Sequence, residues 1–158
     1  MRCLTLSQPW ATLITIGAKR VETRRWHPHE NPGVIVIASS KKPMSAAHRR
    51  LLDFEPFSSA LNGTETPVGC LLAVARLRIC RRTEEIVEEL SEHERAFGDY
   101  SPRRWAWEFD VVEQLDEPVP IPSAKPGEKK TFRLGLWDVP KTLITPELTE
   151  AVLAVERA

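Results

Sequence analysis

The chain has 158 residues, enough for one ordinary domain with its own core, so folding requires neither a disulfide framework nor a structural metal. Its 22 basic and 22 acidic residues give a net charge of zero, which excludes a generic polycation. Residues 1–50 nevertheless carry nine Lys or Arg and two Glu, a net charge of +7, while residues 51–158 carry thirteen and twenty, a net charge of −7, which leaves room for a local anion site.

The pattern of apolar and polar residues predicts strands separated by short helices. In chain order, we expect a strand at 2–6, a helix at 7–17, strands at 19–26 and 34–40, a helical segment at 44–61, a long strand at 68–80, a helix beginning at residue 83, a strand at 105–115, an extended segment at 117–122, a strand at 132–139 and a helix at 145–158.

Proline, glycine and hydroxyl residues are expected to set the ends of these elements. Ser7 is suited to cap the first helix, and Gly17 to end it. Pro56 must kink or split the helical segment that contains it. Gly69 is a candidate for a bulge in the long strand, and Thr83 for the cap of the helix that follows.

About six strands lie among short helices without regular β-α-β alternation, a pattern that favours an α+β fold. We expect a small mixed β-barrel or curled sheet with flanking helices rather than a doubly wound sheet. No internal repeat or domain-separating linker is present, so residues 1–158 are expected to form a single domain.

The cysteines, histidines and apolar residues argue against several classes of protein. Three cysteines without C-x-x-C spacing and four histidines without ligand spacing predict no metal site, and we expect no cofactor. Cys70 and Cys80 fall in apolar strand sequence and are expected to be reduced core residues. No apolar run approaches the roughly 20 residues of a membrane span. With no hydrophobic leader either, we expect a cytoplasmic protein.

The segment GAKRVETRRW, residues 17–26, places four cations around one carboxylate. On a strand, Arg20, Glu22 and Arg24 share one face, so Glu22 is expected to pair with an arginine. The positive charge left over suits a phosphate or another anion. A solvated edge strand with ordinary surface ion pairs is the alternative.

Two neighbouring features are candidates for the same site. Trp10 and Trp26 flank the basic segment in sequence, and aromatic faces beside cations hold single-stranded or flipped-out bases. Each tryptophan can instead be a core residue, and Trp10 is the better candidate for a binding role. The segment SSKKP, which contains Ser40 and Lys41, follows a buried strand and is either a phosphate-binding corner or a solvated loop.

Several blocks of the sequence together resemble the ASCH family, named for activating signal cointegrator 1 homology. The blocks span roughly Cys3 to Val139 and are LTLSQPWATLITIGAKRVETRRW, GVIVIASSKKP, VGCLLAVARLRIC, FGDYSPRRWAWEF and GLWDV. The most specific elements are Q-P-W at residues 8–10 and G-x-K-x-x-E-x-R, formed by Gly17, Lys19, Glu22 and Arg24. The resemblance implies a PUA-like barrel with a cleft where this second motif meets the end of the first helix.

The resemblance also implies a nucleic-acid-binding module, for RNA in particular, with a basic cleft that could hold a single nucleotide or modified base. Lys19, Arg24 and Lys41 would contact phosphate or a base edge, Glu22 would orient Arg24 or accept from a base amine, and Trp10 would stack. The expected contact residues are Gln8, Trp10, Lys19, Glu22, Arg24, Ser40 and Lys41.

The alternative function is a hydrolase acting on a modified nucleoside or RNA, similar to an N4-acetylcytidine amidohydrolase or a ribonuclease. Lys19 would then be the base or nucleophile activator and Glu22 its partner. In the amidohydrolase branch of the family, a Thr stands at the position of Glu22 and a Glu lies on a later strand, where CLLAVARLRIC has none. The chain is more similar to the longer cointegrator-like branch. A protein-interaction domain using the acidic helix at 84–94 is a third interpretation.

Overall fold

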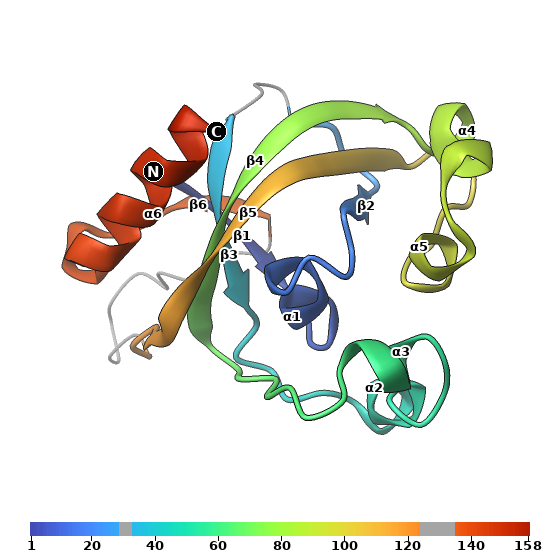
Figure 1. Cartoon of the computed structure of the whole chain (residues 1–158), viewed down its shortest axis with the longest axis horizontal. Helices are drawn as coiled ribbons and strands as arrows, with labels where there is room; N and C mark the ends of the chain where they lie inside the picture. Colours follow the sequence, from blue (N-terminus) through green and yellow to red (C-terminus); the bar gives the residue numbers. More distant parts are fainter. Residues whose placement is uncertain (29–32, 124–134) are drawn as a thin grey trace.

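The computed structural model describes residues 1–28, 33–123 and 135–158, and in these ranges six strands form one mixed sheet (Figure 1). The strands are β1 (Arg2–Leu6), β2 (Val21–Arg24), β3 (Val34–Ser39), β4 (Cys70–Arg82), β5 (Trp105–Pro120) and β6 (Leu136–Asp138). Their order in the sheet is β2-β5-β4-β3-β1-β6, with β1 and β3 parallel and the other pairs antiparallel. The expected α+β fold with a curled mixed sheet is confirmed.

Helices lie inside the curl, along its rim and on its outer face. The α-helices are α1 (Trp10–Thr15), α2 (Ala46–Leu51), α3 (Phe57–Ala60), α4 (Thr83–Ile86), α5 (Glu92–Ala96) and α6 (Pro146–Arg157), and two 3-10 turns are η1 (Val87–Glu89) and η2 (Lys141–Leu143). Among the described residues, none of these helices has the length and apolar character that a membrane span requires.

The sheet curls because its two longest strands, β4 and β5, bend together. Their pairing shifts register at three places, and such bulges increase local twist and bend a strand. The bend brings the edge strand β2 close to β1 on the far side of the sheet, where Arg24 Nη2 donates to the backbone oxygen of Thr5 at 2.9 Å. The sheet is therefore a half-barrel whose seam is bridged by an arginine side chain rather than by a strand ladder.

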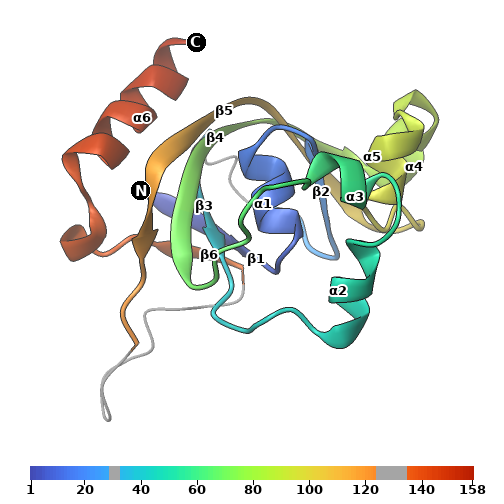
Figure 2. The same cartoon turned by 60° about the horizontal axis from the view of Figure 1, so that its bottom comes forward.

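The two largest buried apolar clusters lie on opposite faces of this sheet, one around α1 and one under α6, the helices that Figure 2 shows on either side of it. On the concave face, Ala11 and Ile14 of α1 pack with Ile37 and Trp107. On the convex face, α6 packs with the other side of β3 and β4, which alternate between the two cores along their length. Since α1 fills the curl, it also fixes which residues remain at the open seam.

The beginning of α1 differs from the prediction. Ser7 is exposed and makes no cap, because Gln8 takes this role: its Oε1 accepts from the backbone N–H of Thr12 at 3.1 Å. The predicted end of the helix is confirmed, since Gly17 has a φ of +73° and its N–H donates to the carbonyl of Ile14.

The other predicted boundaries hold in part. Pro56 does split its segment, into α2 and α3. Gly69 precedes β4, and the register shifts lie further along the strand, so the predicted bulge site is wrong. Thr83 is the first residue of α4 and not its cap. Its hydroxyl donates to the carbonyl of Ser101 and so holds the loop before β5 in place.

The remaining predicted elements are shorter or longer than expected. The strand at 105–115 and the extended segment after it form the single strand β5, and the helix from residue 83 breaks into α4, η1 and α5. Of the expected strand at 132–139, residues 132–134 lie outside the described residues. The cysteines are free, as expected, with Cys70 buried and Cys80 half-buried.

Candidate functional site

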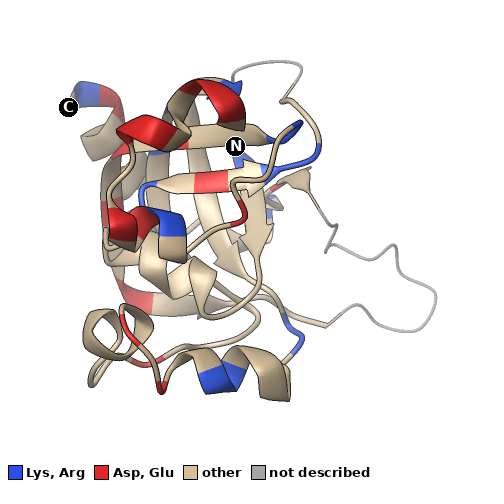
Figure 3. Cartoon of the chain, turned by 90° about the vertical axis from the view of Figure 1, so that its right-hand side faces the viewer, with Lys and Arg blue, Asp and Glu red and all other residues tan. Residues whose placement is uncertain are grey.

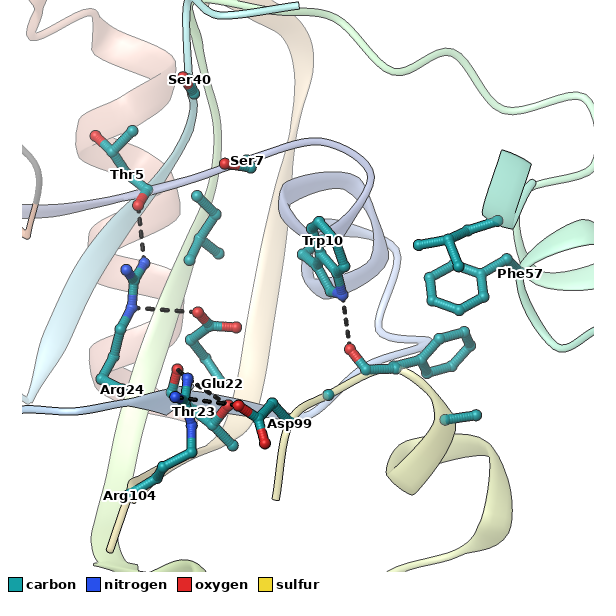
Figure 4. Close-up of a pocket in the computed structure, with 15 residues that line it drawn as sticks. Thr5, Ser7, Trp10, Glu22, Thr23, Arg24, Ser40, Phe57, Asp99 and Arg104 are labelled. Carbon is teal, nitrogen blue, oxygen red and sulfur yellow. Dashed lines mark hydrogen bonds and ion pairs between the residues drawn. The ribbon is translucent and has the colours of Figure 1, made fainter. Parts of the chain in front are cut away.

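A cavity of about 450 Å³ opens at the seam of the half-barrel, where β2 faces β1 (Figure 4). Its walls come from β1, β2, the start of α1, the α2–α3 segment and residues 96–104. The cavity exists because the sheet curls without closing, so the backbone and side chains along the seam face open space.

One wall of the cavity is apolar and aromatic. Trp10 donates its indole N–H to the carbonyl of Phe97 at 2.6 Å, and Phe57 packs edge-to-face against the Phe97 ring at 5.0 Å. His48 of α2 packs its ring against Trp10 with 4.7 Å between centroids. These contacts fix the orientation of the Trp10 ring from both ends, so the wall is built before any ligand arrives.

The opposite wall holds two ion pairs. Glu22 Oε1 lies 3.2 Å from Arg24 Nε, and Asp99 Oδ2 lies 3.2 Å from Arg104 Nη1. Arg104 also donates through Nη2 to the backbone oxygen of Thr23 at 3.2 Å. The strand prediction that Glu22 pairs with a same-face arginine is confirmed, since alternate residues of β2 point into the cavity together.

The charge of the cavity is balanced rather than basic. The charged residues that line it are Glu22, Arg24, Asp99 and Arg104, two of each sign. Hydrogen bonds from Ser101, followed by the positive charge of Arg104, lower the pKa of Asp99, which keeps this carboxylate ionised. The expected basic cleft is therefore corrected to a neutral cleft with four fixed charges. Viewed from the side of Figure 3, the acidic residues concentrate on α4 and α5, and the basic ones are spread over several elements.

Lys19 lies in a buried cluster behind the cavity. Its side chain is fully buried, and its Nζ donates to the backbone oxygen of Val21 and lies 3.3 Å from Glu94 Oε1. The Glu94 carboxylate also accepts from the hydroxyl of Tyr100 at 2.9 Å and from the backbone N–H groups of Arg20 and Val21. Burial, and after it the Glu94 charge, raise the pKa of Tyr100, so its hydroxyl remains a donor.

Gly98 separates this cluster from the cavity. It lines the cavity, and a Cβ at this position would lie 3.3 Å from Lys19 Nζ and 2.7 Å from the Tyr100 ring. Only a residue without a side chain fits there, because a Cβ would overlap the Tyr100 ring and crowd the Lys19 amine.

The family model described as the ASCH domain matches residues 4–119, most of the chain. The chain belongs to the ASCH family. The matched region includes every residue that lines the cavity, whereas β6 and α6 lie outside it.

Two curated relatives of this ASCH chain are the activating signal cointegrator 1 proteins of Homo sapiens and Mus musculus. They are 29% and 28% identical over 96 aligned residues, and the alignment covers 57% of this chain. The match covers only 16% of each cointegrator, so the chain corresponds to a small part of those proteins.

Solved structures support the fold of the ASCH chain. The ASCH protein of Zymomonas mobilis is 15% identical, with a TM-score of 0.52 over 97% of this chain and 93% of that one. A crystal structure of a mutant of the same Zymomonas mobilis protein is 16% identical, with a TM-score of 0.51 over 97% and 96%. At this identity the likeness establishes the half-barrel architecture alone.

The predicted contact residues of the ASCH chain separate into two groups. Those that line the cavity are Trp10, Glu22, Arg24 and Ser40. Those that do not are Gln8, Lys19 and Lys41. Gln8 is buried between α1 and the carbonyl of Pro67, and Lys41 Nζ donates to the carbonyl of Pro122 at 2.6 Å. Within the described residues, the carboxylate partner of Lys19 is Glu94 and not Glu22.

Sequence reasoning missed the contribution of residues 94–104. Glu94 falls at the end of the acidic segment 84–94, which sequence pattern offers as a protein-interaction surface, yet it is buried and pairs with Lys19. Asp99 and Arg104 form the second ion pair of the cavity. Phe97, Asp99 and Arg104 all fall in the block FGDYSPRRWAWEF, so the resemblance already contained a signal for this wall. The described residues include no cluster of acidic, histidine or cysteine side chains able to hold a metal ion.

Proposed function

We propose that this ASCH domain binds single-stranded nucleic acid, RNA in particular, by taking one base into the cavity at the seam. The observation that supports this most is the pairing of an aromatic wall, formed by Trp10 and Phe57, with the fixed charges of Glu22 and Arg24. The cavity volume of about 450 Å³ is within the range of small-molecule sites and suits one nucleoside rather than a duplex.

The two walls offer a base complementary chemistry. An aromatic wall accepts the face of any base, because every base has a π-face. Glu22 has a second carboxylate oxygen that can accept from an exocyclic amine, as acidic residues do with cytosine. Arg24 and Arg104 can donate to a phosphate or carbonyl oxygen. The neutral total charge means that affinity depends on these fitted contacts as well as on phosphate attraction.

The test is binding of labelled single-stranded RNA, single-stranded DNA and duplex RNA to the whole chain, measured by fluorescence anisotropy at several salt concentrations. We expect the single-stranded RNA to bind and its affinity to fall as salt rises. Glu22→Gln preserves the shape of the cavity and removes one charge, so it is expected to change affinity and base preference. Glu113→Gln, an exposed residue elsewhere on the sheet, is the matched control.

Negligible binding of all three probes at low salt would overturn this proposal. Equal effects of Glu22→Gln and Glu113→Gln would instead remove the cavity as the binding site. A cytoplasmic location and a preference for RNA over DNA are further parts of this proposal. The binding experiment tests the preference for RNA.

A hydrolase is the second candidate, favoured by the position of Lys19 directly behind Gly98. Displacement of residues 96–99 would expose the amine, together with Glu94 and Tyr100, to a bound nucleoside. The chemistry would be proton transfer to or from water at an acyl or phosphoryl group. Incubation with N4-acetylcytidine and with short RNA tests it. Absence of turnover, or turnover that survives in a folded Lys19→Met variant, would remove this candidate.

A further inference from the structure

An aromatic and basic surface adjoins the neutral cavity at the end of the half-barrel. It consists of Trp26, His27, Arg82 and Trp105, and we refer to these four residues as the Trp105 row. Trp105 begins β5 and is directly opposite Arg24 of β2 on one side and Arg82 of β4 on the other. Directly opposed residues of a sheet share a face. Because Arg24 also lines the cavity, the cavity and the row belong to one continuous surface.

Three side chains of the row pack together around Trp105, and the fourth, Trp26, packs on the buried Trp107. The Arg82 guanidinium carbon lies 3.8 Å from the centroid of the Trp105 ring, and His27 packs its ring edge-on against Trp105 at 4.4 Å. Trp26 packs edge-on against the buried Trp107 at 4.8 Å and remains 36% exposed. The row is therefore an ordered platform, with one guanidinium held over an aromatic ring and the Trp26 ring anchored to the core.

Within the part of the chain that the structure describes, Arg82 differs from the other arginines of its strand in forming no ion pair with a carboxylate. Arg76, Arg78 and Arg81 pair with Asp110 or Glu108 on the outside of the sheet, at 2.7 to 2.9 Å. No ion pair of the described residues involves Arg82. The difference follows from the register shift at residues 77–79, which turns Cys80 and Arg82 toward the face of Trp107 and Trp105.

A guanidinium that lies on an aromatic ring and forms no ion pair among the described residues is suited to nucleic acid. Bases of single strands stack on aromatic rings and on arginine planes, and the charge attracts the adjoining phosphate. Arg25, which is exposed and also without an ion pair among the described residues, follows Arg24 along the same edge. Glu84 and Glu85 of α4 lie just beyond Arg82, where Glu85 accepts from the Arg82 backbone N–H, so the basic surface ends there.

We propose that the Trp105 row binds the nucleotide adjacent to the one held in the cavity, so that a single RNA strand runs from the seam across Arg24 to Arg82. This rests on the proposed function, since the cavity defines the first nucleotide. Across directly opposed strands the Cα atoms are only about 5 Å apart. Neighbouring nucleotides can thus reach Arg24 and Trp105 without a change in the sheet.

The test compares two probes on the whole chain: a nucleoside 5′-monophosphate, which reports the cavity alone, and a mixed-sequence RNA pentanucleotide, which reports the cavity and the row. We expect the pentanucleotide to bind more tightly. Arg82→Ala is expected to weaken pentanucleotide binding by roughly tenfold, as the loss of one stacked base predicts, and to leave monophosphate binding unchanged. Arg82→Lys keeps the charge without the plane and is expected to lose most of the same affinity.

Arg78→Ala is the matched control, because it removes an arginine from the same strand on the outer face, where it pairs with Glu108. Thermal melting of the variants checks that each is folded. If Arg82→Ala and Arg78→Ala have equal effects, or the pentanucleotide binds no more tightly than the monophosphate, the row is not part of the binding site. The proposal that the cavity binds a base is then unaffected. If Arg82→Ala weakens pentanucleotide binding but Glu22→Gln does not, the row binds RNA and the cavity proposal fails.

Discussion

Lys19 carries a charge at a position that water does not reach, and its partner Glu94 is nearly as buried. Removing one member of such a pair leaves the other charge unpaired in a medium of low dielectric constant. We therefore expect Lys19→Met to lower the free energy of unfolding by about 3–5 kcal/mol. Urea unfolding followed by circular dichroism measures this change.

The control for Lys19→Met is Arg2→Met, which breaks a surface ion pair with Asp138 whose two side chains are 45% and 74% exposed. Such pairs contribute at most about 1 kcal/mol. The double variant Lys19→Met, Glu94→Gln is expected to recover part of the loss, because no uncompensated charge remains. Equal stabilities of the Lys19 and Arg2 variants would contradict the structural role of the buried pair.

At the scale of elements, Gln8 fastens the beginning of α1 to the loop before β4. Its Nε2 donates to the carbonyl of Pro67 at 2.7 Å, and its Oε1 accepts from Thr12. Gln8→Ala leaves both backbone groups without this partner, which costs on the order of 1–3 kcal/mol. Hydrogen exchange should show the Thr12 amide losing protection together with this decrease in stability.

Ser7→Ala distinguishes this account from the capping role that sequence pattern assigned to Ser7. The Ser7 side chain makes no cap bond, so its removal is expected to leave both stability and Thr12 exchange nearly unchanged. A larger effect from Ser7→Ala than from Gln8→Ala would show that the helix begins as the sequence suggested.

Sequence pattern located the Glu22–Arg24 pair because alternate residues of a strand share a face, which is a local property. It did not assign Gln8 or Lys19 correctly to the interior, because their partners are distant in the chain. Gln8 meets Pro67, 59 positions away, and Lys19 meets Glu94, 75 positions away. The curled sheet was predictable from the spacing of strands, but the seam depends on bulges that no single residue type marks.

At the scale of the whole molecule, the two cores share their strands. Val36 and Val74 face the convex core with α6, while Ile35 and Ala75, their neighbours in sequence, face the concave core around α1. A loss of packing on one face therefore loosens the same strands that support the other. This coupling predicts that the described strands and helices unfold as one cooperative unit, as expected for a single domain.

Leu148→Ala in α6 tests this coupling, since Leu148 is fully buried in the convex core and far from the seam. The cavity left by the truncation is expected to cost about 2–5 kcal/mol. Urea unfolding monitored by circular dichroism and by tryptophan fluorescence should shift to lower midpoints that still coincide. Leu153→Ala, on the same helix but 42% exposed, is the control and should change little. If the midpoints from circular dichroism and from fluorescence differ in Leu148→Ala, α6 and the convex core unfold separately from the half-barrel. The sheet around the cavity would then remain folded without them.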